Sequence, residues 1–172
     1  PRSTPKPSSA ASDVYKRQYP IEVVETVKTI VMQVENSKRV IVPQDPPNIR
    51  TKRFITKSVC FHAAQIANDI KANAICTLTN SGYTAYQISA WRPISNILVF
   101  TSNKRILTQL SLLWGVKAFY YDNFQSTDNT VEEINAIAHQ KGYVKEEDLV
   151  VNLTAMPISK KGMVNTLRVS VI

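Results

Sequence analysis

Short apolar segments alternate with helical patterns from about residue 53 onward, and this alternation limits the possible folds more than any other feature. The apolar segments lack polar alternation, which is typical of strands that are buried on both faces of a sheet. Helical patterns separate the first four segments, as crossover helices do between parallel strands. The expected strands are 74–78, 96–101, 116–121, 148–153 and 167–171.

The link between the last two expected strands differs from the others, because it is short and has no helical pattern. Such a link favours an antiparallel return at the edge of the sheet. We therefore expect an α/β fold with three α/β/α layers, in which a mostly parallel five-stranded sheet has an antiparallel last strand. The expected helices are 53–71, 82–91, 104–114 closed by Gly115, and 127–140 opened by Ser126 or Thr127 and closed by Lys141 and Gly142.

The chain before this domain divides into three stretches. Residues 1–18 are rich in Pro, Ser and charge and show no hydrophobic period, so we expect a disordered or non-native tail. In 19–36, apolar residues recur at helical spacing and Pro20 suits the first helical position, which predicts an amphipathic helix. The prolines of 37–52 predict an extended linker that leads into the domain at 53–172.

The formal net charge of the chain is +8, and part of this excess lies in the first stretch. The other basic residues are scattered, apart from a group formed by Arg50, Lys52, Arg53 and Lys57. No nucleic-acid readout motif accompanies the charge. We therefore expect no nucleic-acid partner, while a single anion site is compatible with the basic excess.

Membrane insertion and metal binding are not expected either. No apolar stretch approaches the roughly 18 residues that a transmembrane helix needs, and no signal-peptide core is visible. The two cysteines, Cys60 and Cys76, stand apart, and no His or Cys cluster has the spacing of metal ligands. Buried free thiols favour a reducing compartment, so we expect a cytoplasmic protein.

The loop after the first expected strand is the strongest candidate for a ligand site. It opens a helix, so its polar groups meet the free amides and the positive end of that helix, beyond the C-terminal ends of the strands. We expect this loop to cradle a phosphate group, with Thr79, Asn80, Ser81, Gly82 and Thr84 as the binding residues. The alternative is a capped helix start, in which Thr79 or Ser81 serves only as the N-cap.

A second loop, between the last two expected strands, contains Lys160, Lys161 and Gly162. Its bases either reach a second phosphate or remain solvated. No catalytic set is expected in the chain. Cys60 and His62 lie two positions apart on an expected helix, so their side chains point to different faces.

Three segments resemble the C-terminal domain of the pyruvate kinase family in the order and spacing of their motifs. They are LTNSGYTAYQISAWRP, FTSNKRILTQLSLLWGV and DLVVNLTAMPISKKGMVNTLRVSVI, and the resemblance covers about residues 53–172. Upstream, the stretch YPIEVV resembles the start of the last helix of that family's catalytic barrel. The resemblance implies that 19–36 is the last helix of a TIM barrel whose remainder is missing from this sequence.

The resemblance also implies a parent enzyme of glycolysis that transfers a phosphoryl group from phosphoenolpyruvate to ADP, with magnesium and usually potassium. The family's catalytic and metal residues lie on the barrel, so this chain alone is expected to be inactive and to hold neither ion. The family's C-terminal domain carries contacts of a homotetramer. In many members it also carries an allosteric site for fructose 1,6-bisphosphate or another sugar phosphate.

Carried over position by position, the family's effector-phosphate loop falls on the candidate loop 79–84. Members that respond to the bisphosphate use a Trp and an Arg in the segment that matches 128–137, and neither is present here. The resemblance therefore favours a monophosphate, such as ribose 5-phosphate or glucose 6-phosphate. A free-standing phosphometabolite-binding module and a purely architectural tetramerisation domain stay open as alternatives.

Overall fold

The computed structural model describes residues 18–37, 45–48, 52–124, 126–157 and 163–172. The chain divides into two compact units, Pro1–Ile41 and Val42–Ile172. The boundary between the units falls inside the predicted linker, 37–52. The predictions for the tail 1–17, for most of that linker, and for Lys160, Lys161 and Gly162 lie outside the described residues.

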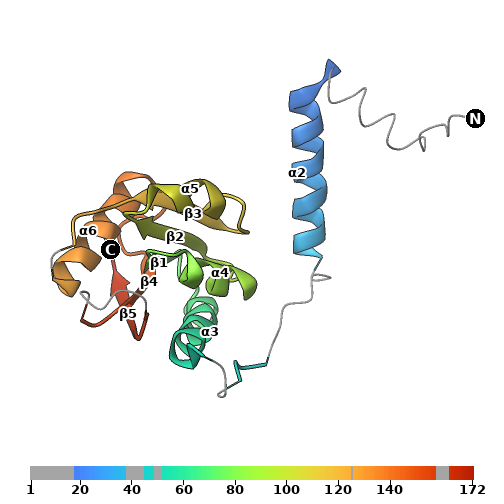
Figure 1. The fold of residues 1–172 in the computed structure, drawn as a ribbon. Helices are drawn as coiled ribbons and strands as arrows, with labels where there is room; N and C mark the ends of the chain where they lie inside the picture. The colour runs from blue at the N-terminus through green and yellow to red at the C-terminus, as the bar shows by residue number, and fades with distance from the viewer. Residues whose placement is uncertain (1–17, 38–44, 49–51, 125, 158–162) are drawn as a thin grey trace, which may run out of the picture. The chain divides into compact units, whose positions relative to one another are not determined.

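The first unit contains helix α2 (Pro20–Asn36), which has the bounds that the sequence predicts (Figure 1). Pro20 takes the start of the helix, and the Glu22 carboxylate lies in the first turn, where it suits the helix dipole. None of the helix's residues is buried, and Ile21 and Val24 are 70% and 68% exposed. Among the described residues of its unit, nothing buries the apolar stripe of α2, and the origin of this helix in a barrel stays a prediction.

The second unit is built on a five-stranded sheet with the strand order β3-β2-β1-β4-β5. The first four strands pair in parallel, and β5 pairs antiparallel with β4. This arrangement confirms the predicted fold class. The strands are β1 (Ala74–Leu78), β2 (Asn96–Thr101), β3 (Val116–Tyr120), β4 (Leu149–Thr154) and β5 (Thr166–Val171).

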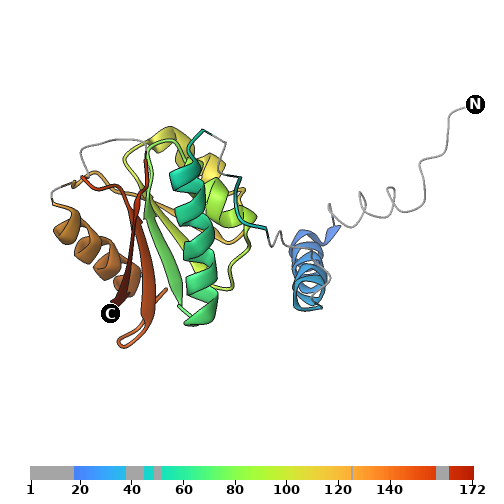
Figure 2. The ribbon, with the colours of Figure 1, turned by 90° about the horizontal axis from the view of Figure 1, so that it is seen from below.

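Helices cover both faces of this sheet, as expected for parallel strands joined by crossovers. The residues of three helices pack into one core cluster, whereas those of α6 pack into a second. Figure 2 shows α3 and α6 on opposite sides of the sheet. The helices are α3 (Phe54–Asp69), α4 (Tyr83–Ala90), α5 (Lys104–Leu110) and α6 (Thr127–Gln140).

Successive residues of the central strands belong alternately to the two core clusters. Ile75 of β1 belongs to the cluster under α3, α4 and α5, whereas its neighbours Ala74 and Cys76 belong to the cluster under α6. All three side chains are fully buried. Burial on both faces explains why these strands read as continuous apolar runs in the sequence.

Two predicted helix ends can be compared with the structure in detail. The prediction for α5 was too long, because the helix ends at Leu110 and a tight turn occupies the residues up to Gly115. The amide of Ile97 donates to the carbonyl of Gly115 at 3.0 Å, so the chain must leave the helix early to align β3 beside β2. For α6 the predicted cap is confirmed, since Ser126 Oγ accepts the amide of Asn129 at 3.2 Å.

Candidate functional site

The strand order creates a switch point between β1 and β4. The chain builds β1, β2 and β3 toward one edge of the sheet and then crosses to place β4 on the other side of β1. The loops that leave β1 and β4 therefore diverge at the same end of the sheet. Open α/β sheets bind ligands in the crevice at such a point. The predicted phosphate loop, 79–84, leaves β1 at this position.

Hydrogen bonds fix the path of this loop at both ends. The amide of Thr79 donates to the carbonyl of Phe100 at 3.0 Å, which extends the pairing of β1 with β2. The carbonyl of Asn80 accepts from Asn103 Nδ2 at 3.1 Å. Thr79 Oγ1 then accepts the amide of Gly82 at 3.0 Å and closes the turn. The loop is thus held in place before any ligand arrives.

The structure corrects the alternative in which Thr79 or Ser81 is the N-cap of α4. The N-cap is Gly82, which has no side chain to accept an amide of the first turn. The preference of N-caps for Ser and Thr gives way here because the position needs a left-handed backbone, with φ of +78°. The first amides of α4 therefore receive no side-chain cap and are available to an anion.

The side chains of the loop differ in their exposure. Asn80 and Ser81 are exposed and Thr79 is half-buried, whereas Thr84 is 4% exposed. Within the described residues, no hydrogen bond of the Thr84 hydroxyl is found. These groups surround the start of α4, so the structure brings the five predicted residues together around one helix end.

Gly82 is the residue of this loop that tolerates substitution least. A Cβ atom at this position would lie 3.2 Å from Leu110 Cδ2, and the positive φ strains any other L-residue. We predict that Gly82→Ala lowers the free energy of unfolding by about 1–3 kcal/mol, measured by urea unfolding. Gly142→Ala is the matched control, because Gly142 has φ of +75° but no atom within 4 Å of its Cβ position. An equal decrease in the free energy of unfolding of both variants would show that the contact with Leu110 does not contribute to the destabilisation.

A cation that the loop prediction missed lies beside this site. The guanidinium carbon of Arg53 lies 4.6 Å from the ring centroid of Tyr83, the first residue of α4. Arg53 is itself the N-cap of α3. The starts of α3 and α4 therefore adjoin one another. The signal in the sequence was the group of four bases near residue 53, which pattern analysis could not assign to the loop.

The loop that leaves β4 is fastened at its base next to the start of α3. Asn165 Oδ1 accepts the amide of Met156 at 2.8 Å, and Asn165 Nδ2 donates to the carbonyl of Met156 at 2.8 Å. The buried Thr56 hydroxyl of α3 donates to the carbonyl of Val164 at 3.1 Å. These bonds fix Met156, Val164 and Asn165, the described residues on either side of 158–162, beside α3.

Cys60 and His62 do not form a nucleophilic pair, and the described residues show no metal-binding cluster. Burial raises the pKa of the Cys60 thiol to about 12, so this thiol is not a nucleophile near neutral pH. The neighbouring His62 is bonded elsewhere, with Nδ1 2.8 Å from the carbonyl of Ser58. In the described part of the chain, no three His, Cys, Asp or Glu side chains converge on a metal position. The same residues include no helix long and apolar enough to span a bilayer.

These features define a class of protein: a three-layer α/β domain whose sheet presents an uncapped helix start at its switch point. A family model described as "Pyruvate kinase, alpha/beta domain" matches residues 57–170 of the chain. The chain therefore belongs to the pyruvate kinase family.

Curated relatives agree with this assignment. The pyruvate kinases of Clostridium acetobutylicum and Geobacillus stearothermophilus are each 32% identical to the chain over 158 residues. The pyruvate kinase of Agrobacterium vitis is 32% identical over 154 residues. The alignments cover 90%, 90% and 88% of this chain but 33%, 26% and 32% of the three relatives. The chain thus spans a third or less of these relatives.

Proposed function

We propose that residues 53–172 are the effector-binding and assembly domain of a pyruvate kinase, and that loop 79–84 binds the phosphate of a sugar-phosphate effector. One observation carries the binding proposal: α4 begins at the switch point with an N-cap that offers no side-chain acceptor. Amides at a helix start, together with the helix dipole, favour a bound phosphate. The resemblance to the family supports the same position, because the family's effector-phosphate loop corresponds to 79–84 of this sequence.

The cation beside the loop and the sequence of 128–137 favour one phosphate over two. Arg53 lies against the first residue of α4, where it can pair with one phosphate. No Trp or Arg occurs within 128–137. A monophosphate such as ribose 5-phosphate or glucose 6-phosphate therefore suits the domain better than fructose 1,6-bisphosphate.

Calorimetric titration of the full 172-residue chain tests this proposal. Ribose 5-phosphate, glucose 6-phosphate and inorganic phosphate are the probes. We predict micromolar to millimolar binding of at least one sugar phosphate, with a Kd raised by about tenfold or more in Ser81→Ala/Thr84→Val. Each lost hydrogen bond to a charged phosphate is worth roughly 1.5–3 kcal/mol, which leaves room for such an effect.

The control for this titration removes the same chemistry elsewhere. Thr108→Val/Ser111→Ala changes two exposed hydroxyls on and just after α5 and should leave the Kd unchanged. An unchanged Kd in the loop variant would overturn the site. The absence of binding by every probe would favour the purely architectural role instead.

The assembly part of the proposal rests on the edge strand β5. Val169 and Val171 are 44% and 67% exposed, and within the described residues β5 pairs only with β4. An exposed edge strand with apolar side chains is a template for pairing with another chain. A second copy of this chain is the partner that we propose, as part of a homotetramer in the parent enzyme.

The proposed parent activity is phosphoryl transfer from phosphoenolpyruvate to ADP. The described residues hold no set of carboxylate, imidazole or thiolate ligands for magnesium. We propose that magnesium, potassium and the chemistry belong to the catalytic barrel, and that this chain alone does not turn over substrate. A location in the cytoplasm is part of the same proposal and is supported by the two buried free thiols, Cys60 and Cys76.

A further inference from the structure

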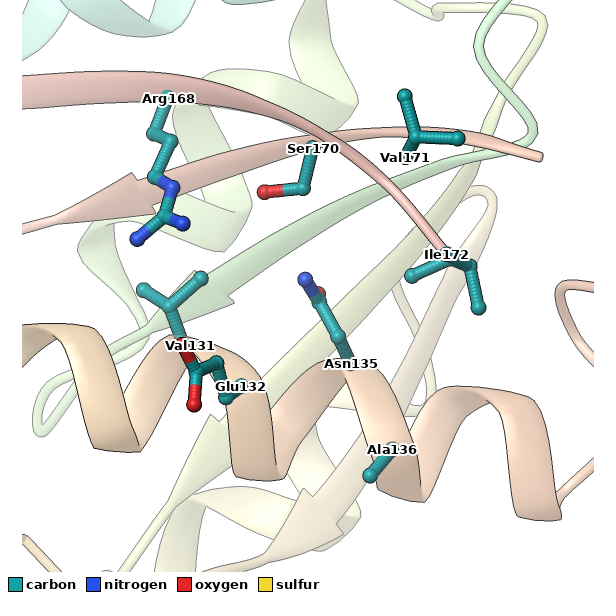
Figure 3. A pocket seen from close by; sticks show the side chains of 8 residues that line it. All are labelled: Val131, Glu132, Asn135, Ala136, Arg168, Ser170, Val171 and Ile172. Carbon is teal, nitrogen blue, oxygen red and sulfur yellow. The ribbon is translucent and has the colours of Figure 1, made fainter. Parts of the chain in front are cut away.

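A pocket lies between α6 and β5, on the face of the sheet opposite to α3, α4 and α5 (Figure 3). Its volume is about 380 Å³, which is within the usual range for small-molecule sites. Figure 3 shows Val131 and Asn135 pointing from the helix toward the strand, and Arg168 and Ser170 pointing from the strand toward the helix. The full lining is Val131, Glu132, Asn135, Ala136, Arg168, Ser170, Val171 and Ile172.

Two buried carboxamides distinguish this pocket from an ordinary gap between a helix and a strand. Asn135 is 8% exposed and lines the pocket, and its Oδ1 has no hydrogen-bond partner among the described residues. Asn152 is 1% exposed, and its Nδ2 donates to Ser170 Oγ at 3.1 Å while its Oδ1 is likewise unpaired. A buried acceptor without a donor costs roughly 1–3 kcal/mol. Asn135 is the one of the two that lines the pocket, and its Oδ1 is itself covered, so a ligand donor would recover this free energy once the carboxamide turns toward the pocket.

The charges around the pocket do not form a dedicated anion site. The guanidinium of Arg168 is already paired with Asp128, with Nη1 2.9 Å from Oδ1. The remaining charged group of the lining is the Glu132 carboxylate. An anion would have to compete with Asp128 for Arg168, whereas the Glu132 carboxylate and the Asn135 carboxamide oxygen are acceptors that suit a neutral ligand with donors. The pocket is therefore chemically unlike loop 79–84.

We propose that this pocket binds an uncharged N-heterocycle that carries an amino group, of the size of a nucleobase or nucleoside. A carboxamide presents an acceptor beside a donor, which matches an exocyclic amino group beside a ring nitrogen, as in adenine. Asn135 supplies this pair of groups. The Ser170 hydroxyl, whose oxygen accepts from Asn152, directs its own proton to a second ring nitrogen. Val131 and Ile172 provide apolar contacts for the ring faces.

The test uses adenosine as the probe and purine riboside as the matched ligand. Purine riboside keeps the ring and the sugar of adenosine but lacks the amino donor. Calorimetric titration or saturation-transfer NMR of the full chain should show adenosine binding at least about tenfold more tightly than purine riboside. Equal affinities, or no adenosine binding up to its solubility, would overturn the proposal and leave a pocket that holds only water.

Two variants locate the binding. Asn135→Leu should abolish adenosine binding without lowering the melting temperature, because it removes an unpaired buried acceptor. If that variant does not fold, Ser170→Ala serves instead and should weaken binding about threefold or more. Ser81→Ala/Thr84→Val should leave adenosine binding intact, so this inference and the proposed phosphate site can fail separately. Binding that survives both pocket variants would place adenosine elsewhere and overturn the assignment.

Discussion

Replacement of Phe100 by Ala is expected to lower the free energy of unfolding by about 3–5 kcal/mol. Phe100 is fully buried near the end of β2, on the face covered by α6. Its ring centroid lies 5.4 Å from that of Phe119 and 6.2 Å from that of Tyr121. The truncation therefore removes apolar contacts and opens a cavity beside the rings of Phe119 and Tyr121. Urea unfolding followed by circular dichroism measures the loss.

The expected loss is large compared with the whole stability of a domain, which is typically about 5–15 kcal/mol. Leu112→Ala is the control, because Leu112 is 87% exposed, and its change should stay within about 0.5 kcal/mol. A Phe100→Ala loss below about 1 kcal/mol would contradict the packing described on the α6 face.

The fold was predictable from the sequence because its main signals are local. Runs such as 74–78 and 96–101 contain apolar residues without alternation, and this pattern alone indicates strands buried on both faces. The absence of a helical pattern before the last strand indicated its antiparallel return. The early end of α5 was not predictable, since it is set by the pairing of Ile97 with Val116 in a neighbouring strand.

The candidate site was predictable in part. Loop 79–84 stands out because it joins a buried run to a helical pattern, and the structure places it at the switch point. The alternative with Thr79 or Ser81 as the N-cap of α4 was wrong. N-caps are usually residues such as Ser and Thr, whereas the backbone here needs a positive φ, which Gly82 adopts. The contact of Arg53 with Tyr83 joins residues 30 positions apart, and periodicity carries no information about such pairs.

The pocket between α6 and β5 was not visible in the sequence at all. In the sequence, Asn135 is one of several polar residues of an amphipathic helix. Asn152 is a single polar residue within an apolar run that predicts a strand. Their unpaired oxygens become informative only once the antiparallel register places Ser170 and Arg168 opposite Val150 and Asn152. Register depends on contacts across the sheet, which a single sequence does not contain.

Substitutions on the exposed edge strand β5 are expected to have a large effect on the assembly of the chain. We predict that Val169→Lys/Val171→Lys raises the dissociation constant of the proposed homo-oligomer by about a hundredfold or more. Burying one valine side chain contributes roughly 1.5–3 kcal/mol, and a symmetric edge pairing buries each residue twice. In the variant, four lysines face one another across the same interface. Sedimentation velocity over a concentration series measures the change.

Leu112→Lys is the matched control for this prediction, because it also places a lysine at an exposed apolar position, away from β5. It should leave the oligomer intact. Both variants should keep the circular dichroism spectrum and melting temperature of the unchanged chain, since exposed substitutions alter stability by about 0.5 kcal/mol or less. An oligomer that persists in Val169→Lys/Val171→Lys would show that copies of the chain meet through another surface. A folded monomer in the same variant would assign the assembly contact to the exposed edge of β5.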